Sequence, residues 1–194
     1  MLANRIDLYI GSPIEHESER TVLIELLRLL EMSGTAATVL ANVYLKGRQL
    51  DLVLGTDRLT LMLEAKSCTA PLRGSENGSW STLTRSGRWK TTRNAYLQAL
   101  DEKNALRDSL REHLGEVTGY PNAHVVFVPG LAPRSELPSD HKVTFGGIEE
   151  IADQLAQHSG LRCTAEQWRT FADRQRLERV FDLASAWVLI SMQT

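Results

Sequence analysis

Two acidic residues and one lysine lie where two short apolar segments could bring them together. Asp51 stands near the start of residues 49–56, and Glu64 and Lys66 stand at the end of residues 59–66. Apolar residues alternate with period two in both segments, which is typical of strands. The sequence therefore predicts two neighbouring strands that carry these three side chains.

The spacing of the two segments also predicts how they pair. If Asp57 and Arg58 form a two-residue turn between them, antiparallel pairing places Asp51 directly opposite Glu64. Lys66 lies two residues beyond Glu64 and therefore shares its face of the sheet. Two opposed carboxylates repel each other and destabilise a sheet, so an ordinary structural pair of strands should avoid them.

A divalent cation between the two carboxylates would remove this repulsion. Mg²⁺ prefers hard oxygen ligands and is commonly held by one or two carboxylates together with water and substrate phosphate. The ammonium group of Lys66 could then orient or help to deprotonate an attacking water, or stabilise charge in a transition state at phosphorus. We therefore expect a Mg²⁺ site at Asp51 and Glu64, in which Mn²⁺ can substitute.

A helix predicted near the N-terminus adds a third carboxylate. Ser12 and Glu15 have the spacing of a capping box at its start, and Gly34 is placed to end it. Glu19 falls on the apolar stripe of this helix, where a carboxylate without a partner is costly. We predict that Glu19 is a metal ligand, with a partly buried structural salt bridge as the alternative. The stripe consists of Val22, Leu23, Leu26, Leu27 and Leu30.

The order of the predicted elements indicates an α/β class with a mixed sheet. The apolar run at residues 123–128 is typical of a buried parallel strand. Thr164 and Gln167 form a capping box that opens a helical C-terminal region through Trp168, Phe171, Leu177 and Phe181. The expected elements in chain order are the first helix, strands at 36–45, 49–56 and 59–66, a helix at 94–114, strands at 123–128 and 143–145, and helices.

Residues 67–93 form a long loop or an excursion hairpin that is rich in basic side chains. This segment contains a single acid, Glu76, and two aromatic residues, Trp80 and Trp89. A basic patch with aromatic side chains suits phosphate contacts and base stacking. The alternative is a solvated loop with Trp89 in the core. The residues predicted to bind nucleic acid are Arg73, Arg85, Arg88, Lys90 and Arg93.

Length and composition restrict the class of protein. The chain has 194 residues, of which 42% are hydrophobic, so we expect a single globular domain over residues 1–194. The formal net charge of -2 leaves nucleic-acid binding to a local patch. Cys68 and Cys163 lie far apart, which argues against a disulfide framework or a thiolate zinc site. No signal peptide or membrane span is predicted, so a cytoplasmic location without membrane association is expected.

Together these residues resemble a known family. Asp51, followed after twelve residues by Glu64-Ala65-Lys66, looks like the PD-(D/E)XK nuclease signature. More narrowly, residues 12–130 are similar to the nuclease-related domain, NERD, although Ser18 and Ala95 stand where the family usually has Gly and Pro. The resemblance is carried by Ser18-Glu19-Arg20-Thr21-Val22, Gln49-Leu50-Asp51-Leu52-Val53, Leu63-Glu64-Ala65-Lys66, Gly87-Arg88-Trp89 and Asn94-Ala95-Tyr96-Leu97-Gln98-Ala99.

The resemblance implies a fold and a set of roles. The fold would be restriction-endonuclease-like, with a nuclease-like core at about residues 12–130 and an α/β and helical extension at about 131–194. Glu19, Asp51 and Glu64, with the carbonyl of Ala65, would hold one or two metal ions. Lys66 would be catalytic, and Gln98 on the following helix would support the site.

The expected function is Mg²⁺-dependent hydrolysis of phosphodiester bonds. DNA is the expected substrate, RNA is not excluded, and family analogy suggests bacterial or antiviral defence or DNA processing. A homodimer or a partner protein of a multi-component system is expected to contribute. The alternative is a catalytically silent module with the same fold that binds nucleic acid or a partner protein.

Overall fold

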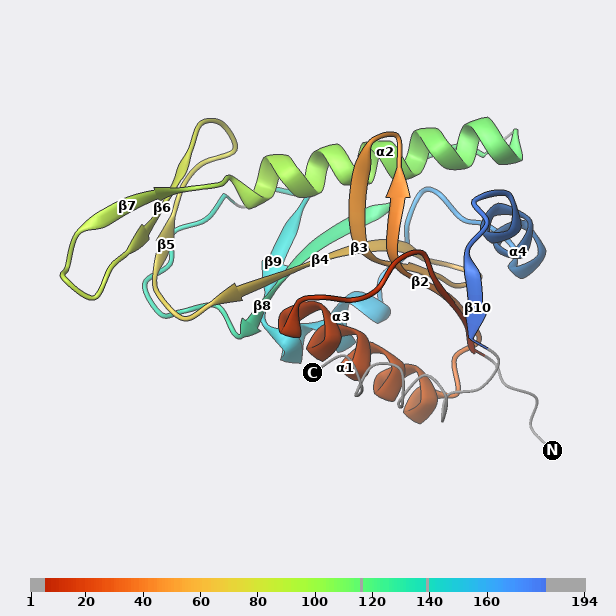
Figure 1. The fold of residues 1–194 in the computed structure, drawn as a ribbon, viewed down its shortest axis with the longest axis horizontal. Coiled ribbons are helices and arrows are strands. Elements are labelled where there is room, and N and C mark those ends of the chain that lie inside the picture. Colours follow the sequence, from red (N-terminus) through yellow and green to blue (C-terminus); the bar gives the residue numbers. More distant parts are fainter. Residues whose placement is uncertain (1–5, 116, 139, 181–194) are drawn as a thin grey trace.

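One mixed sheet carries most of the candidate residues (Figure 1). The computed structural model of the protein describes residues 6–115, 117–138 and 140–180. Within this part of the chain the sheet has seven strands. In their order across the sheet these are β10 (Glu178–Val180), β1 (Ile6–Ile10), β2 (Ala37–Leu45), β3 (Arg48–Gly55), β4 (Thr60–Cys68), β8 (Asn122–Pro129) and β9 (Thr144–Gly146).

The strands predicted from period-two alternation pair as expected. β2, β3 and β4 are antiparallel neighbours, and β8 runs parallel to β4. Between β3 and β4 the backbone N–H of Thr56 donates to the carbonyl of Leu59 at 2.8 Å, which confirms the turn at Asp57 and Arg58. β1, which the sequence analysis missed, lies parallel to β2.

Helices cover both faces of the sheet, so the predicted α/β class with a mixed sheet flanked by helices is confirmed (Figure 1). α1 (Glu17–Ser33) packs on one face, together with the short helix α3 (Ile151–Leu155), which follows a 3-10 turn at Ile148–Glu150. α2 (Ala95–Leu114) and α4 (Ala165–Arg174) pack on the other face.

The start of α1 differs from the prediction, whereas its end and its buried face agree. The helix begins at Glu17 with His16 as N-cap, and no side chain caps it. The predicted capping box is therefore wrong, since the Ser12 hydroxyl instead donates to the carbonyl of Asn42 on β2 at 3.1 Å. Gly34 ends the helix in the left-handed conformation, with φ 63°, as expected. The whole predicted apolar stripe is buried.

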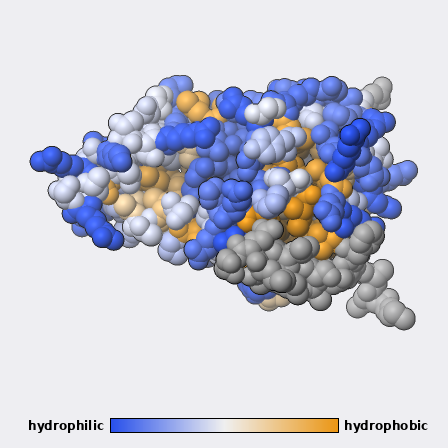
Figure 2. Space-filling view, viewed as in Figure 1, coloured by the Kyte–Doolittle hydropathy of each residue, from blue (hydrophilic) through white to orange (hydrophobic). Residues whose placement is uncertain are grey.

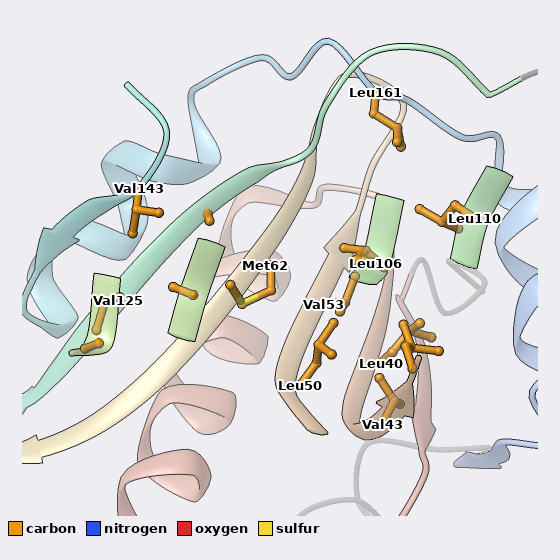
Figure 3. Packing of buried hydrophobic residues seen from close by; sticks show 14 of the residues in the cluster. Leu40, Val43, Leu50, Val53, Met62, Leu106, Leu110, Val125, Val143 and Leu161 are labelled. Atoms are coloured by element: carbon orange, nitrogen blue, oxygen red, sulfur yellow. The ribbon is translucent and has the colours of Figure 1, made fainter. Parts of the chain in front are cut away.

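α2 lies along the sheet and closes the larger part of the core. Its N-cap Asn94 accepts a hydrogen bond from the backbone N–H of Leu97 at 3.0 Å. Figure 3 shows Leu106 of this helix beside Val53 of β3, with Met62 of β4 on one side of them and Leu110 on the other. The helix face that reaches this core also carries the polar residues Gln98 and Glu102, described below.

At Asn42 the alternation of side chains between the two faces of the sheet is interrupted in β2. Its φ is 52°, a left-handed conformation that Asn tolerates better than most residues. Ala41 before it packs on the α1 side of the sheet, whereas Val43 after it packs on the α2 side. The partner strand changes in the same way, because Leu52 faces α1 and Leu50 faces α2. Strict period-two alternation through residues 49–56 would place Leu50 on one face with Leu52 and Leu54, and for Leu50 this expectation is wrong.

The part of the C-terminal region that the structure describes, up to Val180, is less helical than predicted. The capping box of Thr164 and Gln167 is present at the start of α4, and Trp168 and Phe171 are buried as expected. The chain then turns and forms β10, which pairs antiparallel with β1 at the edge of the sheet. The prediction of a helix through Leu177 is thus wrong: α4 ends at Arg174, and β1 provides backbone partners from Glu178 onward. Phe181 lies outside the described residues.

Residues 69–93 form a small sheet that projects beyond the main one, and we call this segment the arm (Figure 1). Its strands are β5 (Leu72–Arg73), β6 (Trp80–Leu83) and β7 (Trp89–Thr92), paired antiparallel. The excursion predicted for this segment is therefore confirmed. The arm starts where β4 ends, close to Lys66. No described helix combines the length and the apolar composition that a membrane crossing needs.

Candidate active site

The candidate site lies where β3 and β4 part from each other. Their ladder of paired residues ends with Leu52 and Leu63. One residue further along β3, the carboxylate of Asp51 takes the place of a backbone carbonyl. It accepts a hydrogen bond from the backbone N–H of Ala65 on β4 at 2.8 Å. The predicted register is confirmed for Leu52 with Leu63 and for Leu54 with Leu61. The side chain of Asp51, beyond these pairs, is fixed by the backbone of the opposite strand.

Glu64 is the most enclosed acid of the group, with a side chain only 1% exposed. Its Oε1 accepts hydrogen bonds from the ammonium of Lys66 and, at 2.5 Å, from the amide Nε2 of Gln98. Its other oxygen, Oε2, is buried and has no hydrogen-bond partner. Lys66 itself remains about one-third exposed. The structure thus brings the four residues predicted as catalytic, Asp51, Glu64, Lys66 and Gln98, into one cluster.

Glu19 approaches the same cluster from α1 and is buried, as its position on the apolar stripe predicts. Its ion pair is with the exposed His16, at 4.0 Å. This pair has the form of the partly buried salt bridge given as the alternative for Glu19, at the upper limit of the contact distance. The charge of Lys66 also acts on the Glu19 carboxylate.

Glu102 on α2 also belongs to the cluster, although it is not among the residues predicted from the sequence. Its Oε1 accepts a hydrogen bond from Gln98 Nε2 at 2.8 Å, while its Oε2 is buried without a partner. Glu102 falls between Ala99 and Leu106 on the buried stripe of α2, which is the same pattern that predicts the burial of Glu19 on α1.

The carboxyl groups of this cluster hold protons unusually tightly. Burial, followed by the charge of Glu64, raises the pKa of Asp51 to about 7. Burial raises the pKa of Glu64 to about 8, with Lys66 opposing the shift and Glu102 adding to it. Burial and the charge of Asp51 raise the pKa of Glu19 to about 7. Burial also raises the pKa of Glu102. The cluster therefore lacks positive charge.

These side chains line a single cleft of about 560 Å³. The cleft brings together every residue predicted to bind metal and every residue predicted to be catalytic, and one of the predicted nucleic-acid ligands, Arg93. The predicted residues in its lining are Glu19, Asp51, Glu64, Ala65, Lys66, Arg93 and Gln98.

The donor set fits a divalent cation in its chemistry but is not already arranged as a metal shell. Among the described residues no three acidic, histidine or cysteine side chains converge closely enough to hold an ion. Hard carboxylate oxygens are the ligands that Mg²⁺ prefers, and Glu64 Oε2 is buried without a partner. Asp51 and Glu64, with the carbonyl of Ala65 and with Glu19, are the residues that could hold the ion.

The arm presents its basic residues to solvent. Arg73, Arg85, Arg88, Lys90 and Arg93 are all exposed, and hydrophilic residues mark the outer rim of the arm in Figure 2. The Arg73 guanidinium lies over the ring of Trp89, 4.1 Å from its centroid. Trp89 is exposed and Trp80 is buried, so the alternative that placed Trp89 in the core is wrong.

Comparison with known proteins gives one match. The family described as NERD, nuclease-related domain, matches residues 14–129, more than half of the chain. The matched segment runs from the residues just before α1 to the end of β8 and contains every predicted site residue. Searches among curated proteins and among solved structures gave no match.

Proposed function

The chain belongs to the nuclease-related domain family, and from this premise we propose that it is a metal-dependent nuclease that hydrolyses phosphodiester bonds of DNA. One observation carries the proposal. Asp51, Glu64 and Lys66 meet at the point where two central strands part, in a cleft that also contains Glu19 and Gln98.

The acids of the cleft support metal dependence. Their raised pKa values and the unpaired Oε2 of Glu64 mean that the cluster carries too little positive charge when it is empty of ions. Mg²⁺, or Mn²⁺ in its place, would supply Lewis-acid polarisation of the scissile phosphate and lower the pKa of a bound water. Asp51, Glu64, the Ala65 carbonyl and Glu19 would hold it.

The remaining side chains have roles that follow from their contacts. Gln98 donates to Glu64 Oε1, which fixes the orientation of that carboxylate and leaves Oε2 available. Lys66 is the partly exposed cation at the mouth of the cleft. Its ammonium can leave Glu64 to hydrogen-bond the attacking water or the phosphate oxygens, where it would stabilise the negative charge that develops.

The arm supports nucleic acid as the substrate. Its exposed basic residues offer phosphate contacts, and the exposed ring of Trp89 offers a surface for base stacking. Arg93 connects the two regions, because it ends the arm and also lines the cleft. A strand bound along the arm would therefore lead to Lys66.

A cleavage assay tests the proposal. The purified protein is incubated with plasmid, linear duplex and single-stranded DNA in Mg²⁺, in Mn²⁺ and in EDTA. Cleavage is expected with either metal and not in EDTA. Lys66→Ala should abolish it, whereas Lys142→Ala, which removes an exposed lysine paired with Asp140, should not. Equal cleavage by wild type and Lys66→Ala would overturn the assignment.

A catalytically silent module is the competing proposal, and one observation favours it. No three acidic side chains of the described residues already converge on an ion position, and Lys66 is bound to Glu64 instead. Thermal unfolding with and without millimolar Mg²⁺ or Mn²⁺ separates the two. A metal site stabilises the folded state by ligand linkage, so an unchanged melting temperature would favour the silent module.

A further inference from the structure

A second cavity, of about 400 Å³, lies between the arm, the end of β4 and the start of α2 (Figure 1). We call it the side pocket, and the proposed function gives it no role. Small-molecule sites in proteins usually have about 300–1,000 Å³, so its size suits a ligand. The side pocket adjoins the cleft, because both are lined by Lys66, Ser67, Arg93 and Gln98.

The floor of the side pocket is apolar and comes from three elements. On the arm, Trp80 pairs with Thr92 and lies two residues before Thr82, so these side chains share the inner face of the small sheet. On β8, Phe127 lies directly beside Lys66 of β4. The floor is thus next to the proposed catalytic lysine. Its buried apolar residues are Leu72, Trp80, Ala95 and Phe127.

Asn94 holds the two walls of the side pocket together. Its Nδ2 donates to the carbonyls of Ser75, Glu76 and Gly78 in the arm, at 3.3, 3.3 and 2.8 Å, while its Oδ1 caps α2. The indole Nε1 of Trp80 donates to the carbonyl of Ser75 at 2.9 Å. The side pocket is therefore already formed before a ligand binds, as is usual for small-molecule sites.

The polar groups of the side pocket are available to a ligand. Among the described residues, the guanidinium of Arg93 and the lining hydroxyls have no hydrogen-bond or ion-pair partner. No acid of the described chain lines the pocket, in contrast to the cleft. Lys66 and Arg93, where the two cavities meet, therefore favour a ligand that carries a phosphate. The lining hydroxyls belong to Ser67, Thr69, Thr82 and Thr92.

We propose that the side pocket takes one unpaired nucleobase of the bound DNA, next to the phosphate that reaches Lys66. This inference rests on the proposed function, which makes DNA the ligand of the neighbouring cleft. A nucleobase has a flat apolar ring and hydrogen-bonding edges, which match the apolar floor and the hydroxyls, and its phosphate would meet Arg93. Extruding a base from a duplex costs free energy, and least for a base that is already unpaired. The preferred substrate class is therefore DNA with unpaired nucleotides.

Binding of two matched duplexes in EDTA tests the side pocket without any assay of cleavage. One duplex carries a single unpaired thymine at its centre, and the other carries an abasic nucleotide at the same position. Both keep the same backbone and phosphates, so they differ only in the base. Fluorescence anisotropy with the full chain should show that wild type binds the thymine bulge roughly tenfold more tightly.

Two substitutions on neighbouring residues of β6 form a matched pair. Thr82→Phe fills the side pocket from the inner face of the arm and should abolish the preference for the thymine bulge. Ser81→Phe adds the same ring on the opposite face, because successive residues of a strand point to opposite sides, and should keep the preference. Thermal unfolding checks that each variant is folded, and the preference of wild type decides the question even if Thr82→Phe does not fold.

The outcomes separate this inference from the proposed function and from a free nucleotide. Equal binding of the two bulges by wild type would overturn the base site, as would a preference that survives Thr82→Phe. Thymidine monophosphate that binds wild type but not Thr82→Phe, together with equal binding of the bulges, would assign the pocket to a free nucleotide instead. Metal-dependent cleavage without the preference would leave the nuclease and overturn the base site, and the preference without cleavage would do the reverse.

Discussion

The cleft and the arm carry opposite charges in opposite environments. The cleft holds four acids, three of them at most 5% exposed and the fourth, Asp51, 8% exposed. The arm holds five basic residues that are all exposed to solvent. Charges in a buried site interact strongly with their individual neighbours, whereas exposed charges are screened and act mainly through their sum. A single substitution in the cleft should therefore change activity strongly. In the arm, only several substitutions together should change DNA binding.

The largest expected difference between the two regions is in the cleavage rate after one acid is removed from each. Glu64→Gln should lower the metal-dependent cleavage rate by about 10²-fold or more, because the charge that holds the ion is lost. Glu76→Gln removes the one acid of the arm and should leave the rate within about twofold. Initial rates of plasmid cleavage at saturating DNA give the comparison. Similar losses in the two variants would mean that the cleft has no special role.

The pH dependence of stability should also come from the cleft. In EDTA, the folded pKa values are about 7 for Glu19 and Asp51 and about 8 for Glu64, against ordinary values of 4.5, 3.8 and 4.5. Between about pH 4 and 8 the folded state binds more protons than the unfolded one, so its stability falls as the pH rises through this window.

Urea unfolding at several pH values measures this effect. Glu64→Gln should reduce the loss of unfolding free energy between pH 5 and 8 by on the order of 2 kcal/mol. Saturating Mn²⁺ should oppose the fall in wild type, because the ion binds the ionised carboxylates. A stability of wild type that rises over this pH range in EDTA would contradict the buried, uncompensated state of the acids.

The arm should respond to combined changes through binding. Replacing Arg85, Arg88 and Lys90 together by Ala should weaken duplex DNA binding by roughly tenfold and reduce the salt dependence of the binding constant, by about 0.9 in slope for each lost phosphate contact. Fluorescence anisotropy from low to moderate salt gives both quantities.

The matched control for the arm changes the same number of exposed basic residues elsewhere. Arg58, Arg162 and Arg169, near α4, should be replaceable by Ala with an unchanged salt slope. The cleavage rate at saturating DNA should stay near that of wild type in both triple variants. If the control weakens binding as much as the arm variant does, the contacts are spread over the whole surface.

The smallest effects concern backbone conformation in the two regions. Asn42 beside the cleft and Gly87 in the arm both have positive φ, 52° and 76°. Substitution by Ala should cost each roughly 1–2 kcal/mol of stability. Asn42→Ala should also reduce cleavage, since it disturbs the strand next to Asp51, whereas Gly87→Ala should not. Asn42→Gly should recover the backbone part of the loss. Equal cleavage by both Ala variants would show that the backbone conformation of Asn42 does not help to position Asp51.

Much of the site could be predicted from local patterns. The alternation of apolar residues and the two-residue turn predicted the register of β3 and β4, and so the meeting of Asp51, Glu64 and Lys66. The stripe of α1 predicted the burial of Glu19. Gln98 came from family resemblance alone, because a polar residue on a helix has no pattern that distinguishes contact with Glu64 from contact with water.

Other parts of the fold depended on contacts between distant segments. The sequence around Ser12 and Glu15 has the local form of a capping box, yet Ser12 binds the carbonyl of Asn42 instead. The region after α4 becomes a strand because β1 lies beside it. Local propensity is weak compared with such tertiary partners.

The sequence by itself therefore determined which chemical groups the protein has, that Glu64 and Lys66 lie together on one strand, and that Glu19 lies on the buried stripe of α1, because those properties follow from short-range periodicity. Only the tertiary structure decided that Glu102 lies beside Glu64, that Asp51 binds the backbone of Ala65, and that Trp89 is exposed while Trp80 is buried. These arrangements depend on how α2, the sheet and the arm pack together, and periodicity along the chain carries no information about packing between elements.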